Sequence, residues 1–225
     1  MLDVGTGTGA VATAAAQEGF QVEAVDSEPT MIEYAREQHS LSNIAFSVVR
    51  LRNLDFASGT FEALAANFVV NHTMDPRAAM AEIGRVMAPG APMGVTIWPS
   101  AISPMNALWN LVMDSAGAIR PSGMRLAPEK DFARTPDGLR TIITEGEFVE
   151  IDVFELTWTF RITPDDHWRA PLAGIATVGE TYGLQDAATK ARMYNAFAEL
   201  TIPLLIDGEL ALPSTAIIAT ALRAG

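Results

Sequence analysis

The chain has 225 residues, of which 49% are apolar and 19% are charged, so it can form a substantial hydrophobic core and is not typical of a disordered protein. Its formal net charge of −12 argues against nucleic acid or an anionic membrane surface as a partner, because both attract lysine and arginine. The lack of cysteine excludes disulfides, thiolate nucleophiles and metals bound by thiolates.

The first hundred residues alternate between strand and helix patterns. Strands separated by helices of roughly 10–15 residues predict parallel βαβ units with right-handed crossovers. The predicted strands cover residues 1–4, 21–25, 44–49, 61–68 and 93–98. The predicted helices cover residues 10–18, 29–38 and 76–87. Ligands of such sheets bind beyond the carboxyl ends of the strands, so we expect a site there.

The second half is less regular. Residues 100–130 contain several prolines and glycines and a helix-like stretch at 109–113, which predicts an insertion after the fifth strand. Further predicted elements are a helix at 134–146, a strand at 148–158, helices at 164–183 and 186–200, and a last strand at 210–222. We therefore expect a ligand-binding half at 1–98. Residues 99–225 would complete the same domain, with lid insertions at about 99–131 and 159–205 and the final strands.

A glycine-rich loop follows the first predicted strand. Residues 3–9 read DVGTGTG, an acid followed by glycines at every second position. Glycines permit positive φ and let a ligand approach the backbone, so the loop predicts a strand that turns sharply into a helix at a nucleotide-type site. Only two residues precede this loop in the chain, and we expect part of the usual site to be missing or supplied by another chain.

Five segments carry a family resemblance. They are residues 2–9 (LDVGTGTG), 25–31 (VDSEPTM), 59–62 (GTFE), 67–72 (NFVVNH) and 82–90 (EIGRVMAPG). In this order and spacing the chain resembles the class I S-adenosylmethionine-dependent methyltransferases, near the small-molecule branch with the ubiquinone/menaquinone-type enzymes, with a short N-terminus. The resemblance implies an α/β Rossmann-like fold: a mostly parallel seven-stranded sheet with an antiparallel last strand and helical lid insertions.

A dinucleotide site is the main alternative for the loop. With Ala10 in last place, the glycines nearly satisfy the dinucleotide fingerprint, and Asp26 lies near the distance expected for a ribose-binding acid. Three features favour the methyltransferase interpretation. Asp3 suits a ligand that carries an ammonium, residues 82–90 have no counterpart in the dinucleotide fingerprint, and the sequence shows no further dehydrogenase signature.

By resemblance, the cofactor is S-adenosyl-L-methionine. Asp3 would lie near its ammonium, Asp26 would accept hydrogen bonds from both ribose hydroxyls, and Met31 would touch the adenine. Each has a structural alternative: an acid that caps the loop, a residue of the helix-initiating turn, and a core side chain. The full set of expected cofactor-binding residues is Asp3, Gly5, Thr6, Gly7, Gly9, Asp26, Ser27, Met31, Arg50, Leu51 and Asn67.

Arg50 departs from the family pattern. It stands where the family usually carries an acid that accepts a hydrogen bond from the adenine amino group. Arginine has five donors and no acceptor, so it cannot take that role. We expect it to stack on the adenine or to bond to Asp26 or Glu28.

His72 is the candidate general base, because it follows the fourth predicted strand and imidazole titrates near neutral pH. A structural histidine is the alternative. The candidate substrate-lining residues are Asn71, Trp109, His167 and Trp168, although lid packing or a solvated helix start would also explain the last three. His39 is expected at the surface. The sequence contains no His, Asp and Glu cluster with metal-ligand spacing, so no metal is expected.

Three functions follow from these observations. The first is methyl transfer to an apolar or aromatic small molecule at oxygen, nitrogen or carbon. The second is a methyltransferase fold that has lost methyl transfer, and the third is an interaction subunit whose first strand pairs with a partner chain. With no basic leader and no apolar run of about 20 residues, we expect a cytoplasmic protein without membrane or nucleic-acid partners. Homodimerisation is left open.

Overall fold

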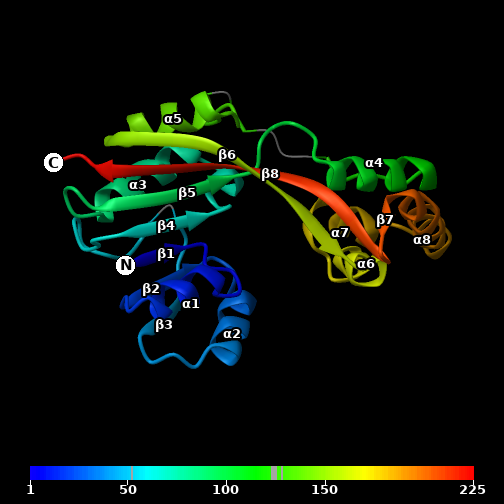
Figure 1. Cartoon of the computed structure of the whole chain (residues 1–225), viewed down its shortest axis with the longest axis horizontal. Helices are drawn as coiled ribbons and strands as arrows, with labels where there is room; N and C mark the ends of the chain where they lie inside the picture. The colour runs from blue at the N-terminus through cyan, green and yellow to red at the C-terminus, as the bar shows by residue number, and fades with distance from the viewer. Residues whose placement is uncertain (52, 123–125, 128) are drawn as a thin grey trace. The chain divides into compact units, whose positions relative to one another are not determined.

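The structure is a computed structural model that describes residues 1–51, 53–122, 126–127 and 129–225 (Figure 1). The chain divides into two compact units. Unit 1 comprises Met1–Ser100, Leu126–Leu156 and Ala216–Gly225, and unit 2 comprises Ala101–Arg125 and Thr157–Thr215. The predicted insertions at 99–131 and 159–205 overlap unit 2, although positions 123–125 and 128 lie outside the described residues. Their role as lids stays a prediction.

The strands form one open, mostly parallel sheet. Its parallel part has the order β3-β2-β1-β4-β5, with β1 (Leu2–Val4), β2 (Val22–Asp26), β3 (Ile44–Val48), β4 (Leu64–Asn67) and β5 (Pro92–Ile97). The last strand, β8 (Glu209–Arg223), pairs antiparallel with β5, and β6 (Phe148–Ile162) follows β8 in the sheet order. A short strand, β7 (Leu205–Ile206), pairs with β8 off this path. The predicted mostly parallel α/β sheet with an antiparallel last strand is confirmed.

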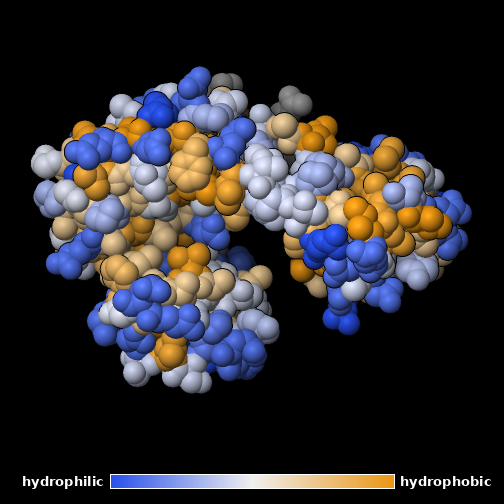
Figure 2. Space-filling model, viewed as in Figure 1, coloured by the Kyte–Doolittle hydropathy of each residue, from blue (hydrophilic) through white to orange (hydrophobic). Residues whose placement is uncertain are grey.

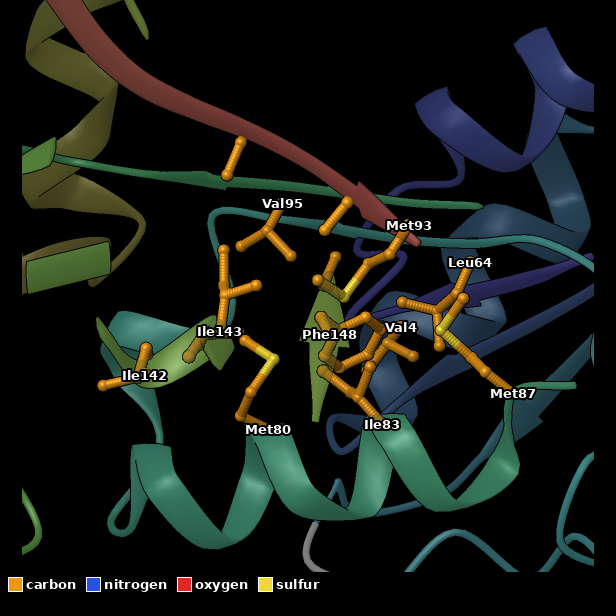
Figure 3. Packing of buried hydrophobic residues seen from close by; sticks show 14 of the residues in the cluster. Val4, Leu64, Met80, Ile83, Met87, Met93, Val95, Ile142, Ile143 and Phe148 are labelled. Atoms are coloured by element: carbon orange, nitrogen blue, oxygen red, sulfur yellow. The ribbon is translucent and has the colours of Figure 1, made fainter. Parts of the chain in front are cut away.

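Helices cover both faces of the sheet in unit 1. They are α1 (Ala10–Gln17), α2 (Pro29–Gln38), α3 (Pro76–Val86) and α5 (Pro136–Glu145), with a 3₁₀ turn η1 at Val70–His72. On the α3 and α5 side, Met80, Ile83 and Ile143 pack with Phe148 and Val95 in the main core (Figure 3). A second cluster, which includes Ile32 and Phe46, buries α1 and α2 against the sheet. Apolar spacing of three to four residues along each helix explains these contacts.

Unit 2 has its own core. It contains α4 (Pro104–Ala116), α6 (Pro164–Leu172), α7 (Ala176–Gly183) and α8 (Ala187–Thr201), followed by a 3₁₀ turn η2 (Ile202–Leu204). Trp109, Trp168, Met193 and Phe197 are among its buried residues. Among the described residues, no helix combines the length and the apolar character needed to cross a membrane.

Several predicted elements were wrong in their bounds. The helix-like stretch at 109–113 is part of α4, which covers Pro104–Ala116, and the strand at 148–158 extends to Ile162. The helix expected at 164–183 is two helices, because Gly174 has φ 72° and the chain turns there. The fourth strand covers Leu64–Asn67 instead of 61–68. Phe61 forms only an isolated bridge with Met87, and Phe68 leaves the strand with φ 56°.

Candidate functional site

The glycine loop makes the predicted tight turn between β1 and α1. Gly5 has φ 66°, and a Cβ atom there would lie 2.2 Å from Cγ2 of Val69. The turn is tied to β2 by the Thr6 amide, which donates to the carbonyl of Val25 at 2.9 Å. Glycine at position 5 therefore lets the loop pack directly on the segment that follows β4.

Asp3 lies buried beneath this loop, with 1% of its surface exposed. Its Oδ2 accepts a hydrogen bond from the Thr6 hydroxyl at 2.7 Å, while Oδ1 is buried without a partner. Burial raises the pKa of Asp3 to about 6, although the hydrogen bond from Thr6 opposes this rise. Asp3 is thus a buried acid with an unused hydrogen-bond acceptor, and its pKa lies close to neutral pH.

Asp26, at the end of β2, forms hydrogen bonds with the glycine loop and with the turn that follows β2. Its Oδ2 accepts from the Gly7 amide at 2.8 Å and its Oδ1 from the Glu28 amide at 3.0 Å. A carboxylate has further lone pairs, so these two bonds leave acceptor capacity for a ligand. The expected contacts with ribose stay a prediction.

A cavity of about 700 Å³ opens at the carboxyl ends of β1 to β4. Its volume falls in the range of small-molecule sites. The predicted site residues on its wall are Gly5, Asp26, Ser27, Arg50, Leu51 and His72. The sequence-based expectation of a site at these strand ends therefore coincides with a real cavity in unit 1.

The other predicted cofactor residues are not on the described wall of this cavity: Asp3, Thr6, Gly7, Gly9, Met31 and Asn67. Met31 is 42% exposed on α2. Asn67 accepts a hydrogen bond from the Thr96 hydroxyl at 2.5 Å, which fixes its side chain to β5. Asn71, predicted to line the substrate site, has a buried Oδ1 without a partner. The roles predicted for these three residues stay predictions.

His72 lies on the cavity wall in η1. Desolvation by surrounding atoms and the nearby positive charge of Arg134 lower the pKa of His72. The imidazole is therefore neutral at neutral pH and can accept a proton.

Sequence reasoning missed two residues of this region. Phe68 lines the cavity in a left-handed conformation and stacks on Trp98, with ring centroids 4.0 Å apart. A phenylalanine at positive φ is strained, and a strand-like sequence gives no sign of it. His39, expected at the surface, donates from Nε2 to the carbonyl of Thr8 at 2.9 Å and so holds the glycine loop.

Three predicted substrate-lining residues come together in unit 2. The Trp109 ring lies 4.9 Å from that of His167 and 6.0 Å from that of Trp168. Trp109 and His167 line a second cavity, whereas Trp168 packs against Tyr182, Tyr194 and Phe197 in the core. Over the described ranges, no group of three or more His, Asp or Glu side chains is placed to hold a metal ion.

Comparison with known proteins identifies the domain that contains the glycine loop. Residues 2–93 match the family model of the methyltransferase domain. Residues 2–93 therefore form a methyltransferase domain. The chain is 27% identical over 165 residues to an uncharacterized methyltransferase of Mycobacterium tuberculosis, covering 73% of the chain and 59% of the relative. It thus spans about three fifths of the length of the relatives matched in this way.

Other known proteins are similar to this chain in part of the sequence or in fold. Over 92 residues the chain is 32% identical to the ubiquinone/menaquinone biosynthesis C-methyltransferase of Desulfotalea psychrophila, covering 40% of the chain and 37% of that enzyme. The branch within the family stays a prediction. The YcgJ protein of Bacillus subtilis shares the fold with a TM-score of 0.63 at 16% identity, over 100% of this chain and 91% of that one. A Haemonchus contortus phosphoethanolamine N-methyltransferase solved with S-adenosyl-L-methionine gives 0.56 at 17% identity, over 100% and 48%.

Proposed function

We propose that the protein binds S-adenosylmethionine in the unit 1 cavity and transfers its methyl group to an apolar or aromatic small molecule. The observation that carries this proposal is the hydrogen bond from the Gly7 amide of the glycine loop to Asp26, at the carboxyl ends of β1 and β2 beside the cavity. The match of residues 2–93 to the methyltransferase domain supports the same cofactor.

The residues at the cavity fit most of this cofactor. Asp3 lies buried beneath the glycine loop and off the described cavity wall, and its unpartnered Oδ1 is the acceptor that we assign to the ammonium, directly or through water. The carboxylate of Asp26 suits a pair of vicinal hydroxyls. Arg50 does not fit the adenine amino group, because both are hydrogen-bond donors. When bound, S-adenosylmethionine supplies an electrophilic methyl group on a sulfonium.

The protein's own task is then to position an acceptor and to remove its proton where it has one. His72 is neutral and faces the cavity, so we assign it the role of general base for a hydroxyl acceptor. Methyl transfer by His72→Gln should be slower by roughly 100-fold with a hydroxyl acceptor. An unchanged rate would remove this role.

A second candidate function rests on Arg50. Arg50 places a hydrogen-bond donor where the adenine amino group would need an acceptor. This favours a protein that has a methyltransferase fold but no longer binds S-adenosylmethionine, and that performs another small-molecule reaction or only binds a ligand. Arg50 lines the cavity with Asp26 and Glu28, whose charges favour an arginine there. The two candidates differ in whether a sulfonium nucleoside binds at all.

Thermal unfolding with S-adenosylhomocysteine separates the two. A ligand of the folded state must raise the unfolding temperature, so we expect an increase that saturates. Arg50→Glu supplies the missing acceptor and should tighten binding roughly 3- to 10-fold, the value of one hydrogen bond. Arg50→Ala is the matched control, because it removes the cation without adding an acceptor.

Each outcome has one interpretation. A saturating stabilisation of the wild type supports the methyltransferase proposal. Stabilisation of Arg50→Glu alone supports the second candidate, a fold that lost its cofactor through Arg50. No stabilisation of any variant overturns cofactor binding in this cavity.

A further inference from the structure

Unit 2 contains a cavity of its own, of about 630 Å³. It is formed by α4, the end of β6, α6 and the start of α7, and every residue on its described wall belongs to unit 2. Met105, Trp109 and Met113 reach it from one face of α4, because they are spaced four residues apart. The volume is typical of a site for a small organic ligand.

The wall is mostly apolar and partly exposed. Phe160 and Ile162 contribute from β6, while Ile102 and Ile175 are 69% and 56% exposed. Figure 2 shows hydrophobic residues gathered on the visible face of unit 2. Large apolar side chains that are left open around a cavity favour an apolar ligand.

His167 is the one buried polar side chain with an unused atom on this wall, among the residues that the structure describes. The residue is 4% exposed, and its Nε2 is buried without a hydrogen-bond partner. Its ring lies beside that of Trp109, at 4.9 Å between centroids. Desolvation lowers the pKa of His167, so the ring is neutral at neutral pH. An unpaired buried nitrogen costs free energy that a ligand atom can recover.

The charges at the cavity cancel. Asp166 and Arg169 form an ion pair at 3.2 Å with exposed side chains. The remaining polar residues on the described wall, His167 apart, are Asn106, Asn110 and Thr177, which are uncharged. A charged ligand would lose its hydration without gaining a net opposite charge, so this wall selects an uncharged molecule.

We infer that unit 2 binds an uncharged aromatic molecule with one hydroxyl or carbonyl group, its ring against Trp109 and Phe160 and its oxygen at Nε2 of His167. A hydroxyl would donate to this nitrogen or a carbonyl would accept from it, since neutral imidazole exists in both tautomers. This binding goes beyond the proposed function, in which the methyl acceptor lies beside His72 in the unit 1 cavity.

Equilibrium dialysis of the full chain against 1-naphthol and naphthalene tests the inference. We expect saturable binding of one 1-naphthol per chain, roughly 5- to 10-fold tighter than naphthalene, because one hydrogen bond is gained. The anion 1-naphthoate should bind at least 10-fold more weakly than 1-naphthol, because the wall offers no net positive charge. His167→Phe should abolish the preference for 1-naphthol over naphthalene.

Cavity filling gives a second, independent variant. Ala170 lines the cavity on α6, so Ala170→Phe should abolish 1-naphthol binding. Ala198→Phe is the matched control, because Ala198 is exposed on α8 and lies off the described wall. Circular dichroism checks that both variants are folded. Equal binding by the two variants, equal affinity for 1-naphthol and naphthalene, or no saturable binding up to the solubility limit would overturn the inference.

The same samples separate this inference from the proposed function. Binding of 1-naphthol without any thermal response to S-adenosylhomocysteine would reject the cofactor while the unit 2 site stands. A response to S-adenosylhomocysteine without 1-naphthol binding would reject the unit 2 site alone.

Discussion

Asp3 is a carboxyl group placed where burial works against its charge. Only 1% of the residue is exposed, and one of its oxygens has no partner. An acid whose only role was to cap the loop would be expected to use both oxygens, as Asp26 does with the amides of Gly7 and Glu28. Asp3 therefore destabilises the folded protein at neutral pH, and a cationic group of a bound ligand would offset that cost.

This arrangement predicts a pH-dependent stability. The pKa of Asp3 is about 6 in the folded protein against 3.8 when unfolded, so the folded state binds more protons between these values. The stabilising contribution is complete below the lower pKa and is lost as pH rises through the upper one, by up to about 3 kcal/mol. Asp3→Asn stays neutral, so relative to this variant the wild type should lose stability from about pH 4 to about pH 7.

Urea unfolding of both proteins across this range measures the effect. Parallel stability profiles for wild type and Asp3→Asn would show that Asp3 titrates normally. If the proposed cofactor binds, S-adenosylhomocysteine should stabilise the wild type more than Asp3→Asn above about pH 7, because only the wild type offers a carboxylate to its ammonium.

At the scale of elements, strand periodicity and glycine positions predicted most of what surrounds the site. The strand ends that carry Gly5, Asp26 and Arg50 could be predicted because each lies between a short apolar run and a turn signal. The left-handed Phe68 could not, since its conformation depends on tertiary contacts with Thr96 and Trp98. Local patterns determine where strands end, but not how the chain leaves them.

The helix break in unit 2 had a different cause. The sequence predicts one long helix at 164–183, which runs through Gly174. In the structure, Gly179 packs so closely on Gly174 that a Cβ atom would lie 2.1 Å from its carbonyl carbon. The pair of glycines marks a tight corner between two helices, which no helical periodicity reveals.

The contact between the glycine loop and the segment after β4 predicts a coupling between two positions. Gly5→Ala should destabilise the protein by about 2 to 4 kcal/mol, because it adds backbone strain and a clash with Val69. Gly7→Ala is the matched control: Gly7 also has positive φ, but no atom lies within 4 Å of its added Cβ, so only strain of about 1 kcal/mol is expected.

Val69→Ala removes the two methyl groups nearest to the added Cβ. It should therefore offset part of the cost of Gly5→Ala, with a coupling of about 1 to 2 kcal/mol in a double-mutant cycle measured by urea unfolding. Additive effects of Gly5→Ala and Val69→Ala would mean that the loop does not rest on Val69.

At the scale of the whole molecule, each buried cluster of described residues lies within one unit. The cluster around Met80 and Phe148 belongs to unit 1, and the cluster around Trp109 and Phe197 belongs to unit 2. Separate cores permit each unit to open locally without the other, at its own free energy. A ligand in either cavity is therefore expected to slow hydrogen exchange at the backbone amides of that unit.

Hydrogen exchange measured by mass spectrometry tests this division. S-adenosylhomocysteine should slow exchange in the peptides that contain the loop after β1, Asp26, Arg50 and His72, because ordering these strand ends suppresses their local opening. An uncharged naphthol should instead protect α4 and α6. Ala170→Phe should remove only the second pattern, since it fills a cavity whose described wall lies within unit 2. If either ligand slowed exchange evenly over both units, the chain would open as one cooperative body. The two cores would then share a single free energy of opening.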